Sequence, residues 1–298
     1  MTVLRTPEER FANLPGFPFQ PCYVEIQGIR VHYVDEGQGE TILCLHGEPS
    51  WSYLYRKLIP SLSARHRILA MDFPGFGRSD KFAERESYSF QRHHDFLVAF
   101  LEKLALADIT LVVQDWGGLI GLTAACEMPK RFSRLVIMNT GLMTGDRPVP
   151  ETILQWRYFV ENTPDLPIGQ IIKGGTVQGI NIPPDVIAAY EAPFPDKSYK
   201  AGASAWPLLI PIGFDDPGAA EMRAARTRLS QWQKPALVMF SDSDPITGKS
   251  AGFFRKLIPT AKDQPEITII NAGHFLQEDK GEEIAQHILE FIDRTPIK

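Results

Sequence analysis

The sequence predicts an α/β protein whose mostly parallel sheet is covered by helices on both faces and interrupted by a helical insertion. In the first half of the 298 residues, short apolar runs rich in β-formers alternate with helical stretches, which is typical of a parallel sheet. Residues 148–217 then hold 11 of the 24 prolines and show no strand pattern. Strand patterns return after residue 235. This order predicts one sheet with an insertion, not two independent domains.

Eight strands are expected, of which the first two form a hairpin. The third is nearly continuous in apolar residues, as a strand buried on both faces should be. The expected strands are Tyr23–Gly28, Ile29–Val34, Thr41–Leu45, Arg67–Met71, Ile109–Gln114, Leu135–Asn139, Ala236–Phe240 and Ile267–Ile270.

Helices are expected between these strands and within the insertion. Phe90–Leu106 places its apolar residues on one face at helical spacing. The other expected helices are Ser52–Leu62, Gly118–Glu127, Trp156–Phe159, Ile168–Ile172, Val186–Tyr190 and the closing Glu282–Phe291. The insertion follows the sixth strand, so we assign residues 1–143 and 218–298 to the core and 144–217 to a helical cap.

Composition and charge exclude several classes of protein. The chain has 31 Lys and Arg against 36 Asp and Glu, a net charge of −5 without charged blocks, which disfavours nucleic acid or an anionic membrane as partner. No apolar run is long enough to span a bilayer, and the polar start of the chain does not resemble a signal peptide. Cys22, Cys44 and Cys126 are isolated, which fits neither a disulfide framework nor a zinc site. We expect a soluble cytoplasmic protein.

A strand runs directly into glycines and a helix at Leu111–Gly118, with Asp115 at the turn. This is the pattern of a nucleophile elbow, in which small neighbours allow a sharp strand-to-helix turn. The usual nucleophile there is Ser. Taken by itself, the segment leaves two roles open for Asp115, a nucleophile or a cap of the following helix.

Two further segments fit the α/β-hydrolase arrangement that this elbow implies. The loop after the third strand, His46-Gly47-Glu48, is where that fold supplies a backbone N–H to an oxyanion hole. The expected donors are therefore the amides of Glu48 and Trp116, while His46 is expected to be a buried structural residue. His274 follows the last strand, where the histidine base of this fold belongs.

An acid that orients the histidine belongs on a loop after strand six or seven. The residues that follow the sixth strand, Asn139 to Gly141, include no carboxylate. The loop after the seventh strand offers two carboxylates, Asp242 and Asp244. Asp244, directly before a proline, fits the fold pattern better, whereas Asp242 also suits a local turn-bonding role.

An aspartate nucleophile limits the chemistry. Because a carboxylate is ionised at neutral pH, Asp115 can displace a leaving group from an sp³ carbon and become an ester. Water deprotonated by His274 can then hydrolyse that ester. A halide leaving group needs only N–H donors in an apolar pocket, and the indole of Trp116 is a donor that cannot accept. An epoxide would instead need a proton donor, usually tyrosine hydroxyls of the cap.

The sequence resembles the haloalkane dehalogenases over nearly its whole length. The segments that carry the resemblance are 113–118 (VQDWGG), 46–56 (HGEPSWSYLYR), 72–81 (DFPGFGRSDK) and 192–196 (APFPD). The match is to the subfamily whose acid follows strand seven. The resemblance implies an eight-stranded α/β-hydrolase fold with Asp115 as nucleophile, His274 as base, Asp244 as its acid partner and Trp116 as a halide donor. It also implies a small apolar halogenated substrate, a halide product and a monomer.

One feature departs from that subfamily, which carries a second halide-binding Trp in the cap. We expect its position between Gly175 and Gln178, where there is no Trp and where the Gln178 amide could donate instead. Trp156 is the nearest upstream indole of the cap, and both a pocket role and helix packing are open for it. Trp206 resembles a pocket-wall aromatic residue, and packing within the cap is open for it too.

Three functions are compatible with these residues. The first is a haloalkane dehalogenase, a hydrolase acting on carbon–halide bonds. The second is an epoxide hydrolase-like enzyme, which would need cap tyrosines facing Asp115, and Tyr158, Tyr190 and Tyr199 are available. The third is a binding protein without catalysis. The sequence contains neither a dinucleotide fingerprint nor a Walker motif, and none of these readings requires a cofactor or a metal.

Overall fold

The computed structural model describes residues 2–297, which form one eight-stranded main sheet and the helices around it. The strand order is β10-β9-β8-β7-β4-β5-β3-β2. The bounds are β2 Cys22–Ile26, β3 Ile29–Glu36, β4 Thr41–Leu45, β5 Arg67–Met71, β7 Ile109–Gln114, β8 Phe132–Met138, β9 Ala236–Ser241 and β10 Ile267–Ile269. A separate pair, β1 Val3–Leu4 and β6 Lys81–Phe82, is antiparallel and was not expected.

The sequence prediction of the sheet is confirmed. All eight expected strands are present, and their ends differ from expectation by three residues at most. Strand β3 pairs in antiparallel fashion with both β2 and β5, and the remaining pairings of the main sheet, from β5 through β4 and β7 to β10, are parallel. The central strand β7 is buried at every position, including its polar residues Thr110 and Gln114.

One expected helix is divided in two. Residues 52–62 form the 3-10 turn η2 Ser52–Tyr55 and the short helix α1 Ile59–Ser63. Pro60 lacks an N–H and is tolerated only in the first turn of a helix, so a new helix starts just before it. The other helices of the core are α2 Phe90–Lys103, α3 Trp116–Glu127, α8 Ala219–Leu229, α9 Ala251–Leu257 and α10 Leu276–Arg294.

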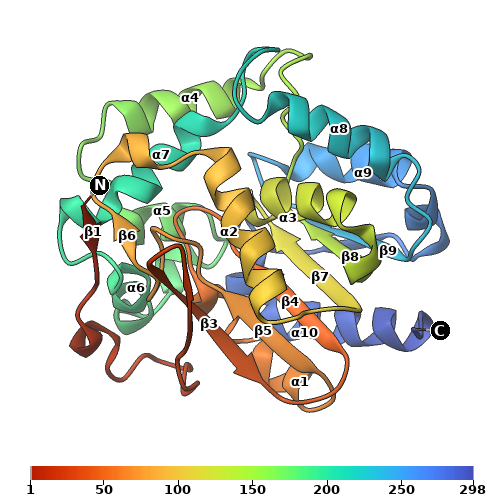
Figure 1. Ribbon diagram of the computed structural model, residues 1–298, viewed down its shortest axis with the longest axis horizontal. Coiled ribbons are helices and arrows are strands. Elements are labelled where there is room, and N and C mark those ends of the chain that lie inside the picture. The colour runs from red at the N-terminus through yellow and green to blue at the C-terminus, as the bar shows by residue number, and fades with distance from the viewer. Residues whose placement is uncertain (1, 298) are drawn as a thin grey trace.

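The helices form a layer on each face of the sheet (Figure 1). Helix α3 packs between α2 and α8, while α1 packs with α10. Helix α3 is almost entirely buried, which suits a sequence that is apolar around its whole circumference. The glycine-rich elbow before α3 therefore lies deep in the molecule.

Four helices lie between β8 and α8, in the segment assigned to the cap. They are α4 Glu151–Glu161, α5 Ile168–Gly174, α6 Pro184–Glu191 and α7 Ala201–Leu209. Helix α4 packs on α7, and α5 packs on α6. Figure 1 shows these four helices gathered at one end of the sheet. Because the loop after β7 shares a cavity with α4 and α5, this is the end where the parallel strands terminate.

Among residues 2–297, no helix combines the length and the apolar character that crossing a bilayer would require.

Candidate active site

Asp115 occupies a strained turn between β7 and α3. Its backbone has φ 50° and ψ −125°, a conformation that L-residues rarely adopt and that is often found at functional sites. Asp115 stands at the N-cap position of α3, yet its side chain makes no capping hydrogen bond. Of the two roles left open for Asp115, helix capping by the side chain is therefore not observed, and the carboxylate is available for chemistry.

The neighbours of Asp115 explain why the elbow needs glycine. A Cβ atom on Gly117 would lie 2.1 Å from the carbonyl oxygen of Leu45, and one on Gly118 would lie 2.1 Å from Thr140 Oγ1. The turn is also tied to the end of β8. The Asp115 N–H donates to the Asn139 carbonyl at 2.9 Å, and the Thr140 hydroxyl donates to the Asp115 carbonyl at 2.6 Å.

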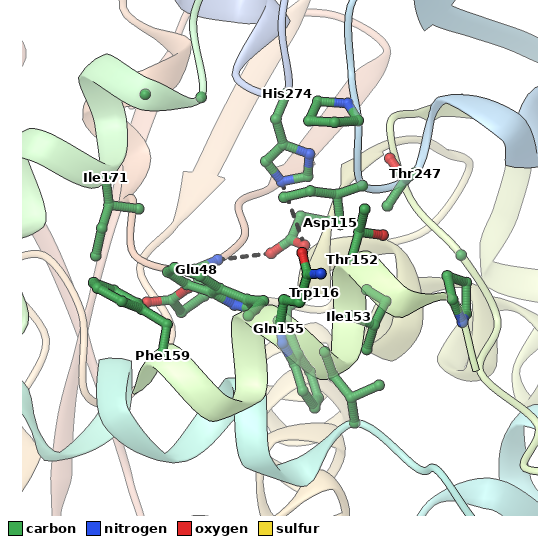
Figure 2. Close-up of a pocket in the computed structure, with 18 of the residues that line it drawn as sticks. Glu48, Asp115, Trp116, Thr152, Ile153, Gln155, Phe159, Ile171, Thr247 and His274 are labelled. Carbon is green, nitrogen blue, oxygen red and sulfur yellow. Dashed lines mark hydrogen bonds and ion pairs between the residues drawn. The ribbon is translucent and has the colours of Figure 1, made fainter. Parts of the chain in front are cut away.

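The Glu48 backbone points its N–H at the carboxylate of Asp115. The distance from Glu48 N to Asp115 Oδ1 is 2.8 Å, and Figure 2 shows this contact. The second expected donor, the Trp116 N–H, belongs to the first residue of α3, where no intrahelical acceptor exists. His46 is buried, and its Nε2 accepts from the Phe73 N–H at 3.1 Å. It is thus placed as the structural residue that we expected.

His274 lies between two carboxylates. Its Nε2 is 3.5 Å from Asp115 Oδ2, and its Nδ1 is 3.0 Å from Asp244 Oδ2 (Figure 2 shows the contact with Asp115). Burial disfavours the charged ring, but Asp244 and Asp115 outweigh it and raise the pKa of His274 to about 10. The arrangement places an imidazole where it can exchange a proton beside Asp115.

The structure separates the two candidate acids. Asp244 is buried, and it also accepts hydrogen bonds from the Ile246 N–H and the Thr247 hydroxyl. Burial opposes its charge, but His274 and these donors lower the pKa of Asp244 to about 2. Asp242 instead accepts from the backbone N–H groups of Asn271 and Ala272. Asp242 therefore bonds the turn, and Asp244 faces the histidine.

A largely apolar cavity of about 560 Å³ opens beside these groups. Its wall combines residues that follow β4, β7, β9 and β10 with residues of α4 and α5. The lining includes Glu48, Asp115, Trp116, Leu119, Met143, Ile153, Trp156, Phe159, Ile171, Ile246, His274 and Phe275. Such a cavity suits a small apolar molecule.

The structure corrects two of the expected aromatic and amide positions. Gln178 is exposed and does not line the cavity. Its backbone N–H donates to Asp279 Oδ1 at 3.0 Å, and this bond holds the residue at the surface of the cap. Trp206 is fully buried behind Trp116, with ring centroids 5.0 Å apart, and its indole donates to His93. It supports the wall without lining the cavity.

Trp156 reaches the cavity from α4, and of the two roles left open for it the structure favours the pocket. It stacks on Phe159, which lies one turn further along the same helix. In residues 2–297, neither the indole N–H of Trp156 nor that of Trp116 donates to another protein group. Two indoles without protein acceptors thus belong to the same cavity wall, Trp156 from the cap and Trp116 from the core.

The cap tyrosines are not arranged as an epoxide hydrolase-like enzyme would require. Tyr158 is 70% exposed, and the Tyr190 hydroxyl donates to Glu278 in a buried contact at 2.6 Å. Neither these two nor Tyr199 is among the described residues that line the cavity. No phenolic proton donor therefore faces Asp115 in the part of the chain that the structure describes.

Two residues beside the site were not singled out from the sequence. Gln114 ends β7, and its amide contacts His274. Asn139 follows β8, and its amide joins Ser241 to the backbone of Gly273 and His274. Both stand where a parallel strand ends, and polar residues at strand ends are the signal that could have identified them. Within the described range, no group of three or more potential ligands could hold a metal ion.

Comparisons with known proteins agree with this geometry. Residues 40–281 match the family described as alpha/beta hydrolase fold. A haloalkane dehalogenase of Psychrobacter cryohalolentis is 49% identical over 99% of this chain and 100% of its own length. One of Mycobacterium marinum is 47% identical over 98% of this chain and 100% of its own. The structure of the haloalkane dehalogenase DpaA from Paraglaciecola agarilytica NO2, described as tetrameric, has a TM-score of 0.90 at 40% identity and covers 97% of this chain and 98% of that one.

Proposed function

The chain belongs to the haloalkane dehalogenases of the α/β-hydrolase fold, and from this membership we propose how its own residues hydrolyse a haloalkane to an alcohol and a halide ion. The observation that carries the proposal is the line of Asp115, His274 and Asp244, with distances of 3.5 and 3.0 Å on the two sides of the imidazole. Asp115 is the nucleophile, His274 the base and Asp244 the group that orients the base.

In the first step, a carboxylate oxygen of Asp115 attacks the carbon that carries the halogen. The carbon–oxygen bond forms as the carbon–halogen bond breaks, and the bonding electrons leave with the halide. The negative charge moves from the carboxylate into the cavity. The indole N–H groups of Trp116 and Trp156, which lack protein acceptors in the described residues, stabilise it there.

In the second step, water attacks the carbonyl carbon of the Asp115 ester while its proton moves to His274 Nε2. The Glu48 N–H, which points at Oδ1 in the free enzyme, stabilises the oxyanion that forms there, together with the Trp116 N–H. The tetrahedral intermediate then expels the alkyl oxygen, which takes the proton from His274 and leaves as the alcohol. Asp115 is restored as a carboxylate after one proton is released.

The substrate class follows from the cavity. Its volume of about 560 Å³ and its Leu, Ile, Met, Phe and Trp side chains suit a small apolar halogenated molecule. The cap, residues 144–217, supplies α4 and α5 to this wall and would therefore govern which haloalkanes fit.

The proposal is tested with 1-bromobutane and 1,2-dibromoethane as substrates. The enzyme is expected to release bromide and protons. Asp115→Asn should abolish this release. His274→Gln should still release one bromide per molecule and retain a butyl ester that adds to the mass of the intact protein. Asp242→Asn serves as the control and should stay active. Absence of bromide release across a broad panel of haloalkanes would refute the proposed function.

Two expectations about the whole protein remain predictions. We propose a cytoplasmic location, since Cys22, Cys44 and Cys126 all lack disulfide partners. We also propose a monomer, although a relative at 40% identity is described as tetrameric. Light scattering after size-exclusion chromatography and fractionation of cells test these two statements separately. A mass four times that of the chain would overturn the second.

A further inference from the structure

Gln114 contacts the imidazole that the proposed mechanism uses as its base. It is the last residue of β7 and directly precedes Asp115. Its side chain is fully buried. Its amide nitrogen lies 3.2 Å from the carbonyl oxygen of His274 and 3.1 Å from the ring nitrogen Nε2 of the same residue. The amide is thus nearer to Nε2 than Asp115 Oδ2, which is 3.5 Å away.

The carbonyl of His274 determines which way this amide points. A carbonyl oxygen can only accept, so the atom of Gln114 that faces it must be the NH₂ group. The Oε1 atom of Gln114 is consequently left buried with no hydrogen-bond partner among residues 2–297. An NH₂ group has two hydrogens. One is donated to the carbonyl, and the other is directed at the imidazole Nε2.

A donor at Nε2 favours one state of the ring. The Asp244 carboxylate lies at Nδ1 and can only accept, so Nδ1 carries a proton. If Nε2 also carried a proton, two donors would face each other at 3.1 Å. The contact with Gln114 is therefore attractive only when Nε2 presents its lone pair, which is the state of a base ready to take a proton from water.

Building on the proposed function, we propose that Gln114 is a positioning residue for ester hydrolysis: once Asp115 is esterified, its N–H favours the neutral form of His274 with the proton on Nδ1 and disfavours a second proton on Nε2. When water enters to attack the ester, it displaces the second N–H of Gln114 from Nε2, while the bond to the His274 carbonyl is retained. After the water proton has moved to Nε2, the nearby donor promotes its transfer to the departing alkyl oxygen.

The charged groups around His274 determine in which state of the enzyme the Gln114 contact affects the protonation of the ring. Asp115, Asp244 and Glu48 face the ring from the loops after β7, β9 and β4. Burial and the nearby Asp115 raise the pKa of Glu48 well above its usual value, which disfavours a negative charge on Glu48 beside the ring. In the free enzyme, burial lowers the pKa of His274, but Asp244 and Asp115 together raise it to about 10. Esterification removes the charge of Asp115. Only Asp244 then raises the pKa of His274, the Gln114 N–H acts against it, and the pKa of the ring falls.

The test measures the two chemical steps separately. With 1-bromobutane, a rapid-quench bromide burst reports formation of the ester, and decay of the butyl-enzyme in intact mass spectra reports its hydrolysis. Gln114→Met removes the donor at similar volume. We expect its burst rate to stay within about twofold of the parent enzyme. The pH midpoint of ester hydrolysis should rise by about one unit, so that hydrolysis on the acid side slows about tenfold and butyl-enzyme accumulates.

A second variant and a control keep the result interpretable. Gln114→Glu places a carboxylate at Nε2 and should raise the midpoint further than Gln114→Met does. Gln277→Met removes another fully buried amide close to His274 in the sequence and should leave the midpoint unchanged. Equal pH midpoints in the parent enzyme and both Gln114 variants would overturn the inference. Failure of the parent enzyme to release bromide would instead refute the proposed function.

Discussion

The backbone of Asp115 stores strain that the surrounding residues must compensate. A residue with φ 50° and ψ −125° costs about 1–3 kcal/mol relative to an ordinary conformation. Hydrogen bonds from both sides of this peptide segment to Asn139 and Thr140 hold it in place. In this conformation the carboxylate makes no helix-capping hydrogen bond and lies 3.5 Å from His274 Nε2, where the proposed mechanism needs a nucleophile.

The His274 and Asp244 pair makes stability depend on pH in two directions. The pKa of His274 is raised to about 10, so its contribution is complete below about pH 6.5 and is lost as the pH rises through 10. The pKa of Asp244 is lowered to about 2, so its contribution is complete above about pH 4 and is lost as the pH falls through 2.

We therefore expect Asp244→Asn to reduce the free energy of unfolding most between about pH 4 and 6.5, by about 3 kcal/mol. The loss should shrink steadily towards pH 10. Urea unfolding of both proteins across this range measures the difference. A loss that is the same at pH 5 and pH 10 would contradict the assignment of the ion pair.

Halide binding gives a prediction for individual tryptophans. Trp116→Phe and Trp156→Phe each remove one indole donor from the cavity and should weaken bromide binding roughly tenfold, because a hydrogen bond to a charged group is lost. Quenching of tryptophan fluorescence by bromide measures the affinity. Trp232→Phe, which changes an indole outside the cavity lining, and Gln178→Ala should bind bromide like the parent enzyme. Weaker bromide binding in the Gln178 variant alone would instead support Gln178 as the second halide donor, as the sequence predicts.

At the scale of elements, Asp279 joins the cap to the segment that carries His274. Its Oδ2 accepts from the Gly273 N–H at 2.8 Å and from the Val177 N–H at 3.0 Å, and its Oδ1 accepts from Gln178. The Phe275 N–H donates to the Gly175 carbonyl beside them. The segment after α5 and the loop before α10 are thus one hydrogen-bonded unit at the edge of the cavity.

Removing this carboxylate should loosen that unit. Asp279→Ala leaves three backbone donors without their acceptor and should lower the free energy of unfolding by about 1–3 kcal/mol. Hydrogen exchange should accelerate in residues 175–178 and at Gly273, while the central strands stay protected. Asp263→Ala is the matched control, since the exposed side chain of Asp263 makes no hydrogen bond or ion pair with the described residues. Faster exchange throughout the molecule in Asp279→Ala would contradict a local role.

At the scale of the whole molecule, a buried network fastens the cap to the core. Arg56 beside η2 forms a two-pronged ion pair with Glu278 of α10, with N–O distances of 2.6 and 2.7 Å. The hydroxyl of Tyr190, on α6, donates to the same carboxylate at 2.6 Å. One carboxylate thus connects three segments that are far apart in the sequence.

This network predicts unequal costs for two substitutions. Glu278→Ala leaves the buried Arg56 guanidinium unpaired and should reduce the free energy of unfolding by about 3–5 kcal/mol. Tyr190→Phe removes the hydroxyl that donates to Glu278 and accepts from Arg56, but it leaves the ion pair intact, so its cost should be about 1–3 kcal/mol. Guanidinium denaturation compares the two variants. A larger loss in Tyr190→Phe than in Glu278→Ala would show that the ion pair is not the main fastening.

Much of the fold could be predicted because its signals are local. Strand β7 and helix α3 are largely apolar segments joined at Asp115, with two glycines in the first turn of the helix, and their types follow from residues that are neighbours in the chain. Residues 52–62 have a helical pattern that predicts a single helix, but the structure divides them into η2 and α1, the second starting just before Pro60. The spacing along the cap sequence points to Gln178 as the second donor, whereas in the structure α4, which packs on α7, contributes Trp156 to the cavity lining.

The sequence by itself determined the order of strands and helices, the elbow at Asp115, the position of His274 after the last strand and the pair of carboxylates from which its partner comes. Only the tertiary structure decided between Asp244 and Asp242, placed Trp206 behind Trp116, turned the cap tyrosines away from the cavity and brought Gln114 to the imidazole. The reason is physical. The type of an element depends on contacts between residues that are close in the sequence. The direction of a loop side chain depends instead on hydrogen-bond donors from distant parts of the chain, as the backbone N–H groups of Asn271 and Ala272 show at Asp242.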